Sequence, residues 1–162
     1  MKKYEVVLVF LILSLIPINI SAQCFSKLAN GGTSIALDSN GNLYTWGLND
    51  EGQLGNGSLT NINLPGQIAE TAQWEAISSS HNFCAAIKSD GTLWTWGDNT
   101  RGQLGDGTNT NRNTPVQVGT DTDWRMISTG SYHCLAIKDN GTLWAWGGNS
   151  QGQLGDGTFN IF

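Results

Sequence analysis

A glycine-rich segment, Gly-Gln-Leu-Gly, occurs three times in the chain, starting at Gly52, Gly102 and Gly152. Backbone N–H groups in such turns can hold phosphate, so the segment invites comparison with a nucleotide-binding loop. A phosphate loop continues into a Lys-Ser/Thr pair and the N-terminus of a helix, and neither follows here. The glycines are therefore predicted to form turns, and we expect no cofactor.

Acidic side chains follow two of these segments, at Asp106 and Asp156, and Asn56 takes the same place after the first. One carboxylate per loop could indicate a cation site. Calcium requires several oxygen ligands at a spacing that this loop does not offer. Asn and Asp serve equally well as acceptors for the backbone of a following turn, so we predict turn-stabilising side chains and no metal site.

The two histidines could in principle bind a metal or transfer protons, but they do not share a position in the repeat. His81 aligns with Ser131, whereas His133 aligns with Phe83. Both are therefore predicted to be structural or surface residues. No Ser-His-Asp set or pair of carboxylates recurs in the repeats, so we predict that the protein has no catalytic residues and is not an enzyme.

Three cysteines cannot all pair within one molecule. Cys84 and Cys134 occupy equivalent positions inside small apolar runs, which indicates buried thiols. A disulfide between them would need Cα atoms within about 7 Å, and equivalent positions in neighbouring repeat units usually lie further apart. The state of Cys24 is left open.

Seven tryptophans are unusual in so short a chain and raise the possibility of light sensing or carbohydrate stacking. Every one of them occupies a repeated position, with Tyr44 replacing tryptophan in the first repeat. Packing between repeat units is the simpler explanation. The tryptophans are Trp46, Trp74, Trp94, Trp96, Trp124, Trp144 and Trp146.

The elements that position these residues repeat every fifty residues without a gap. Residues 74–108 and 124–158 share 21 identities in 35 positions. Within a repeat, the apolar run 84–88 leads through Asp90-Gly91 into the β-branched and aromatic run 92–96, which predicts a β-hairpin with a type I′ turn. Two further extended segments give about four strands per repeat. The period and the strand count predict an all-β fold of propeller blades.

Residues 91–107, with the Ala-Ile strand before them, resemble the repeat of the regulator-of-chromosome-condensation family. The resemblance covers about residues 27–162 and implies a β-propeller of seven four-stranded antiparallel blades, of which this chain holds about three. Founding members of that family are chromatin-associated nucleotide exchange factors for a small GTPase. The alternative function is therefore a guanine nucleotide exchange factor-like regulator of a small GTPase.

The amino-terminal segment differs from the rest in composition. Lys2 and Lys3 precede an apolar run, and small residues end it at Ala22, so residues 1–22 are predicted to be a signal peptide. A retained membrane anchor is the alternative, but the run is shorter than the roughly 20 residues of a spanning helix. Residues 23–162 are assigned to propeller repeats, at about 27–80, 81–130 and an incomplete 131–162. We expect a secreted or cell-surface protein without a stable membrane span once the signal is removed.

The chain carries a net charge of −5, and its basic residues are scattered. This pattern argues against a nucleic-acid groove and favours an unknown protein partner. The preferred function is a noncatalytic extracellular protein-binding module, part of a longer protein or self-associating, because open blades need neighbours. Loops 58–68 and 108–118 vary most between repeats, and the candidate partner-binding residues there are Leu59, Ile62, Asn63, Leu64 and Arg112.

Overall fold

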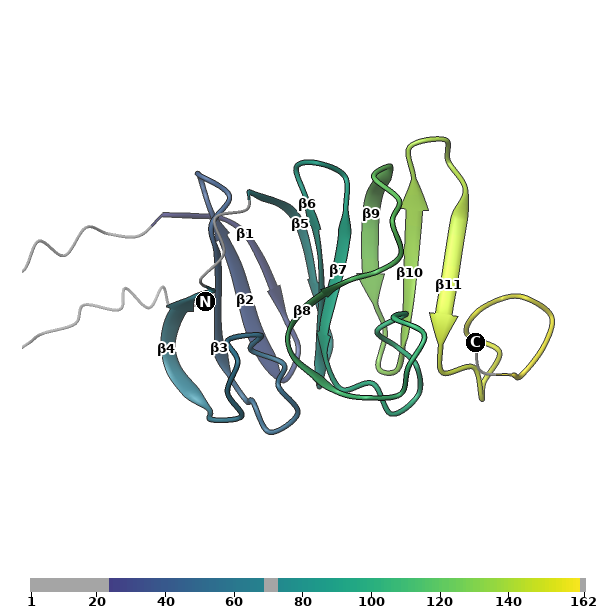
Figure 1. Cartoon of the computed structure of the whole chain (residues 1–162), viewed down its shortest axis with the longest axis horizontal. Coiled ribbons are helices and arrows are strands. Elements are labelled where there is room, and N and C mark those ends of the chain that lie inside the picture. The colour runs from purple at the N-terminus through teal and green to yellow at the C-terminus, as the bar shows by residue number, and fades with distance from the viewer. Residues whose placement is uncertain (1–23, 69–72, 161–162) are drawn as a thin grey trace, which may run out of the picture.

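Three antiparallel sheets follow one another along the longest axis of the molecule (Figure 1). The computed structural model describes residues 24–68 and 73–160, and every regular element in these two ranges is a strand. The all-β, blade-like architecture predicted from the repeat is therefore confirmed. Residues 1–22, for which a signal peptide is predicted, lie outside the described residues.

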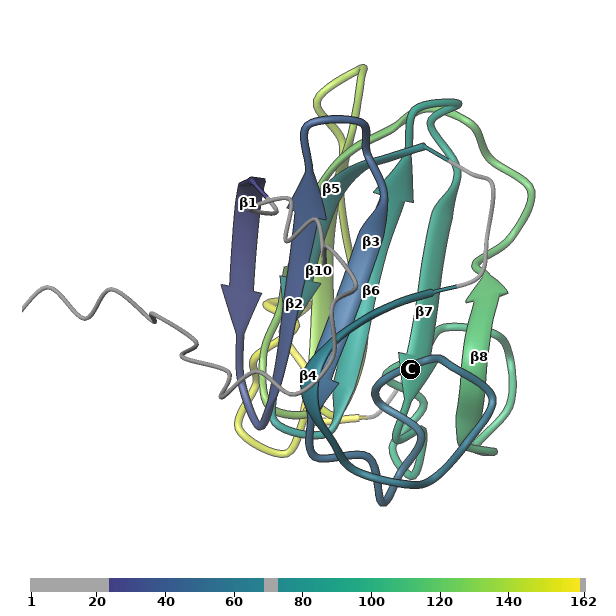
Figure 2. The same ribbon diagram turned by 90° about the vertical axis from the view of Figure 1, so that its left-hand side faces the viewer.

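Blades 1 and 2 each have four strands in sequence order, and blade 3 has three, ordered β11-β10-β9. Figure 2 faces blade 1 and shows the other sheets stacked behind it. Blade 1 contains β1 (Phe25–Asn30), β2 (Thr33–Asp38), β3 (Leu43–Gly47) and β4 (Ile62–Gln67). Blade 2 contains β5 (Trp74–Ser79), β6 (Phe83–Lys88), β7 (Leu93–Gly97) and β8 (Arg112–Gln117). Blade 3 contains β9 (Trp124–Thr129), β10 (His133–Lys138) and β11 (Leu143–Gly147).

The strand register follows the fifty-residue period. Thr33 pairs with Gly47 in blade 1, and Phe83 pairs with Gly97 in blade 2. The sheets are out of phase with the predicted repeat boundaries, since residues 81–130 contain three strands of blade 2 together with β9. A sequence repeat fixes the period but leaves the starting point of each sheet undefined.

The turns that join β2 to β3, β6 to β7 and β10 to β11 differ from the prediction. Gly41 has a φ of +78°, but no non-glycine residue in the described ranges has a positive φ. A type I′ turn needs positive φ at both central residues, so that prediction is wrong. Gly41 N instead donates to Asp38 O, and Asp38 N donates to Asn42 O. This is the longer hairpin connection, in which a type I turn is followed by a left-handed glycine.

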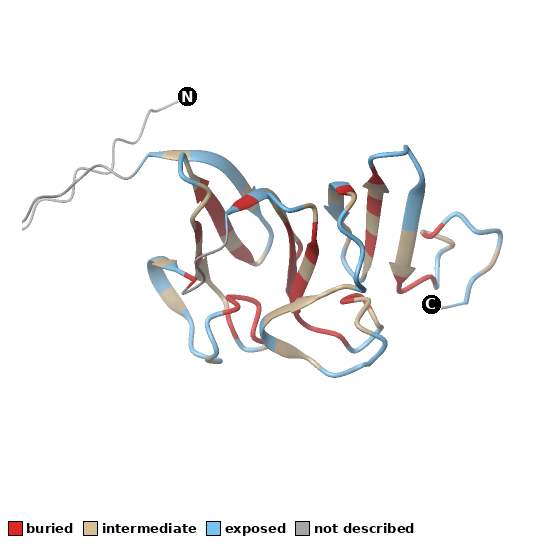
Figure 3. Ribbon diagram, turned by 45° about the horizontal axis from the view of Figure 1, so that its top comes forward, coloured by how far each residue is buried: buried red, intermediate tan, exposed pale blue. Residues whose placement is uncertain are grey.

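The core lies between the blades rather than inside one sheet (Figure 3). Ile35 and Leu43 of blade 1 pack with Trp74, Cys84 and Trp96 of blade 2 in one buried cluster. A second cluster joins blades 2 and 3 in the same way. Because each blade is covered on its face by the next, both faces of β6 are buried, which explains its run of small apolar residues.

Each blade carries a group of three aromatic rings. Trp74 lies edge-on to Trp94, with centroids 6.3 Å apart, and Trp124 lies edge-on to Trp144 at 5.9 Å. In blade 1 the corresponding ring is Phe25, which contacts Tyr44 at 5.5 Å. The interpretation of the tryptophans as packing residues therefore describes a repeated aromatic cluster, although Trp144 keeps half of its surface exposed.

Within the described ranges, no helix has the length and apolar character required to cross a bilayer.

Candidate functional site

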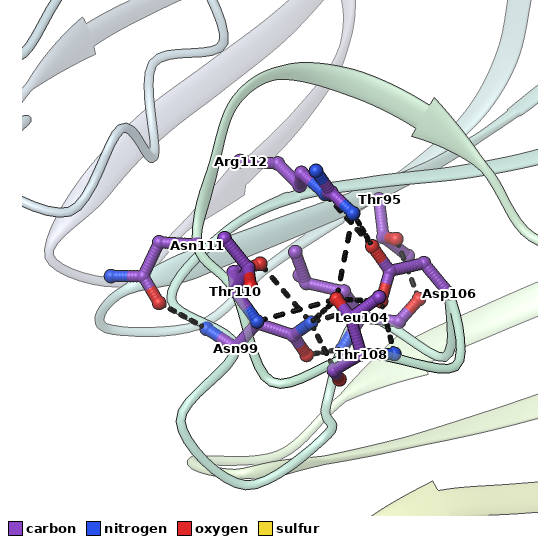
Figure 4. Close-up of polar contacts among 8 residues, drawn as sticks. All are labelled: Thr95, Asn99, Leu104, Asp106, Thr108, Thr110, Asn111 and Arg112. Carbon is purple, nitrogen blue, oxygen red and sulfur yellow. Dashed lines mark hydrogen bonds and ion pairs between the residues drawn. The ribbon is translucent and has the colours of Figure 1, made fainter.

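The loops at one end of the blades are held from beneath by a buried asparagine. In blade 2 this is Asn99, which is fully buried and whose amide donates to Thr108 O at 2.9 Å and Thr110 O at 3.2 Å (Figure 4). Its side-chain oxygen accepts from Leu104 N at 3.0 Å. Asn49 and Asn149 make equivalent bonds in their own loops. The loops after the Trp-Gly strands are therefore fixed platforms.

Asp106 closes the same loop. Its carboxylate accepts hydrogen bonds from Thr108 N and Thr108 Oγ1, and it forms an ion pair with Arg112 at 2.7 Å. Burial opposes ionisation of Asp106, but the bonds from Thr108 and Arg112 outweigh it, so its pKa lies below the ordinary 3.8. Asp156 and Asn56 accept from Thr158 and Ser58 in the same geometry. These contacts confirm the turn-stabilising interpretation of the three residues.

The Gly-Gln-Leu-Gly segment joins one blade to the next. Trp146 Nε1 donates to Gln103 O at 3.0 Å, and Trp96 Nε1 donates to Gln53 O at 2.9 Å. A Cβ on Gly105, whose φ is +66°, would lie 2.6 Å from Trp146 Nε1. The second glycine is therefore required both by the backbone conformation and by the approach of the next blade.

A shallow hollow of about 380 Å³ lies on the loop face where blades 1 and 2 meet. Its lining comprises Asp50, Glu51, Leu59, Asn111 and Asn113. The two sides are tied together, because Asn111 Nδ2 donates to Glu51 Oε2 at 2.5 Å and Asn113 Nδ2 donates to Gly57 O at 3.0 Å. The hollow thus combines an exposed leucine with two carboxylates and contains no basic side chain.

The candidate residues chosen from the sequence are distributed between this hollow and two outer strands. Leu59 lines the hollow and is 59% exposed. Ile62, Asn63 and Leu64 belong to β4, so half of the predicted loop is a strand, and Leu64 faces outward with 62% exposure. Arg112 begins β8, and its guanidinium is committed to Asp106. The structure therefore does not bring Arg112 into one site with Leu59.

Two residues of the hollow were missed by the sequence reasoning. Asp50 and Glu51 directly precede the constant Gly-Gln-Leu-Gly segment and were passed over as part of the repeat. Glu51 is replaced by Arg101 and Gln151 in the later repeats. This variation beside a constant motif is the signal that could have identified them.

The cysteines are all thiols, and Cys84 and Cys134 are fully buried, as predicted. Burial raises the pKa of Cys84 to about 12 and raises that of Cys134 as well. These two sulfur atoms are therefore packing groups at neutral pH. Cys24 is exposed.

His81 is exposed and His133 is partly buried. Burial lowers the pKa of His133 below 6.5. No group of three His, Cys, Asp or Glu side chains suited to a metal ion occurs among residues 24–68 and 73–160.

Stacked antiparallel sheets with one register, repeated every fifty residues and joined by tryptophan hydrogen bonds, define a protein built from β-propeller blades. The family model of the regulator of chromosome condensation (RCC1) repeat matches residues 40–87 and 90–137. A second model of the same repeat matches residues 74–103 and 126–153. The chain belongs to the RCC1 repeat family.

Solved structures with this fold include Prp20p of Saccharomyces cerevisiae, whose title describes its binding to Gsp1p and histones. Its identity to this chain is 22% and the TM-score is 0.74, with 85% of this chain and 36% of Prp20p covered. Human WBSCR16 matches at 24% identity and a TM-score of 0.70, with 76% of this chain and 33% of WBSCR16 covered. The chain spans about a third of the length of these structures. No curated protein matches the sequence.

Proposed function

We propose that this protein is a noncatalytic, exported protein-binding module, and that its loop face holds the partner at the hollow between blades 1 and 2. The observation that carries the proposal is the position of Leu59. Its side chain is 59% exposed at a rigid hollow whose other side is a strand of the next blade. An exposed apolar group on a fixed platform favours a protein partner, because little conformational entropy is lost on binding.

The charges in the hollow narrow the class of partner. Asp50 and Glu51 place two carboxylates beside Leu59, and the lining offers no cation to balance them. A partner surface that combines a basic side chain with an apolar one is complementary to this arrangement. The net charge of −5 would further favour a basic partner during encounter.

The proposal is tested with a photo-crosslinking residue at position 59, applied to the extracellular fraction of the producing organism. A crosslinker at Ser39, an exposed residue in the turn between β2 and β3, is the control. We expect a product that forms from position 59 and not from position 39.

The crosslinked protein is then purified and its dissociation constant measured by calorimetry. Leu59→Arg and Glu51→Lys are each expected to weaken binding at least about tenfold, because they place a positive charge against a basic surface. Ser39→Arg should leave the affinity unchanged. Equal affinity for all variants would refute the hollow as the binding site.

Export is tested separately by fractionating cells that carry a tagged full chain. We expect the mature form, without residues 1–22, outside the cytoplasm. A cytosolic protein that retains these residues would instead favour the exchange factor-like alternative.

A further inference from the structure

The outer edge of blade 3 differs from the outer edges of the other blades. In blade 2, β8 pairs with β7 in antiparallel register, with Thr95 opposite Val116 and Gly97 opposite Arg112. In blade 1, β4 pairs with β3 in the same register. Among the described residues, β11 pairs with β10 alone. Its outer backbone groups therefore form an open edge, which is a template for another strand.

A cavity of about 860 Å³ lies beside this edge. Its walls are β11, the blade 2 loop that follows Asn99, and the segment that connects blade 2 to blade 3. In blade 2, β8 runs in the corresponding space, between β7 and the loop of blade 1. The cavity has the position of a fourth strand. Its lining includes Gly105, Gly107, Val118, Trp124, Trp144 and Trp146.

The loop of blade 2 also presents contacts that its counterpart in blade 1 already uses. Gly57 N donates to Asn113 O at 2.8 Å, and Gly57 O accepts from Asn113 Nδ2 at 3.0 Å. The counterpart of Gly57 is Gly107, which has nothing within 4 Å of the place of a Cβ. Gly107 is therefore free to make the same pair of bonds with an asparagine supplied from elsewhere.

The apolar contacts show the same vacancy. Val118 follows β8, donates its N–H to Leu93 O at 2.8 Å, and packs in the cluster that contains Leu93. Ile68 does the same for Leu43. Leu43 and Leu93 are at most 1% exposed, whereas their counterpart Leu143 is 63% exposed.

We propose that the outer edge of β11, with the cavity beside it, is a binding site for an extended peptide segment with the pattern Asn-x-Pro-x-Gln-(Ile/Val), supplied by a partner molecule. The pattern is what the two filled sites have in common, at Asn63–Ile68 and Asn113–Val118. The peptide would run antiparallel to β11, with its Gln opposite Trp144. Its final Val N–H would donate to Leu143 O. Main-chain pairing would supply affinity, and the Asn and Val positions would supply selectivity.

A synthetic peptide with the sequence of residues 112–119 tests the proposal on the full chain. We expect saturable binding, followed by a blue shift of tryptophan fluorescence as Trp144 is covered. Hydrogen exchange of the complex should show new protection at Leu143, Ala145 and Gly107. Protection confined to β1, or no binding, would overturn the proposal.

Peptide variants make the test independent of protein folding. N-methylation at the position of Val118 removes one main-chain hydrogen bond and should weaken binding at least about fivefold. Asn113→Ala in the peptide should weaken it to a similar extent. A scrambled peptide should not bind, and equal binding of the scrambled peptide would refute the site.

The oligomeric state of the chain, measured by sedimentation with and without peptide, tests a different occupant. A second copy could fill the edge with one of its own strands. Stable dimers that the peptide leaves intact would place a second copy at β11 and would overturn the proposal.

Discussion

At the scale of single residues, polar side chains in the loops are used to hold backbone rather than to perform chemistry. Asn99 is fully buried and connects the start, middle and end of its loop through its one amide group. A buried amide is tolerated only when both its donors and its acceptor are satisfied. The same arrangement in all three loops explains why this asparagine occurs in every repeat.

Replacing Asn99 by alanine is expected to lower the free energy of unfolding by about 3 kcal/mol. The change removes several hydrogen bonds and leaves buried backbone groups without partners. Asn109→Ala, in the exposed part of the same loop, should cost less than about 0.5 kcal/mol. Urea unfolding of both variants measures the difference, and equal stabilities would contradict the role given to Asn99.

The carboxylate of Asp106 is expected to make stability depend on pH. Its pKa in the folded protein lies below 3.8, so its contribution is complete above the unfolded value and is lost as the pH falls through the folded value. Asp106→Asn should therefore destabilise the protein by about 1–2 kcal/mol at pH 7 and by much less near pH 2. Thermal unfolding at both pH values provides the test.

Asp139→Asn, at an exposed position before Asn140, is the control for the charge change. It should shift stability by less than about 0.5 kcal/mol at pH 7. The role of Asp106 would be disproved if the two variants lost the same stability at both pH values.

At the scale of elements, the Gly-Gln-Leu-Gly segment connects two neighbouring blades. Its backbone carbonyl binds the indole of the following blade, and its second glycine leaves space for that ring. The motif is therefore a packing device whose function appears only when the next sheet is present. This explains why the segment has the composition of a phosphate loop without its chemistry.

Gly105 and Gly155 allow the effect of packing to be separated from that of backbone conformation. Their φ angles are +66° and +69°, but a Cβ on Gly155 would meet nothing within 4 Å. Gly155→Ala should cost about 1–2 kcal/mol through its left-handed conformation. Gly105→Ala should cost about 1–3 kcal/mol more, because it also displaces Trp146. Chemical denaturation measures both, and equal losses would show that the close approach of the ring is unimportant.

At the scale of the whole molecule, stability depends on stacking because each blade covers the face of its neighbour. Leu93 lies in the cluster between blades 2 and 3, whereas its counterpart Leu143 lies at the open side of blade 3 (Figure 3). Identical residues at equivalent positions therefore experience different environments.

Leu93→Ala is expected to lower the free energy of unfolding by about 3 kcal/mol, since it removes buried apolar surface and leaves a cavity. Leu143→Ala should change it by less than about 0.5 kcal/mol, because the side chain is 63% exposed. Thermal unfolding of the two variants compares them directly. Equal losses would mean that Leu143 is covered in solution.

Several features could be predicted from the sequence, and the misses have specific physical causes. The hairpins followed from local patterning, but the turn type was wrong because one glycine in the left-handed region suffices for the longer connection. Phe25 was missed as the aromatic partner of Tyr44 because β1 carries an irregularity, which places Phe25 opposite Asp38 one residue out of the fifty-residue period.

The sequence by itself determined the repeated unit, its strands and its membership of the RCC1 repeat family, because these depend on residue order over a few tens of positions. The tertiary structure alone decided which leucine is buried, that Leu59 meets Asp50 and Glu51 in one hollow, and that Arg112 is bound by Asp106. Burial and proximity arise between blades, and a pattern within one blade does not contain its neighbour.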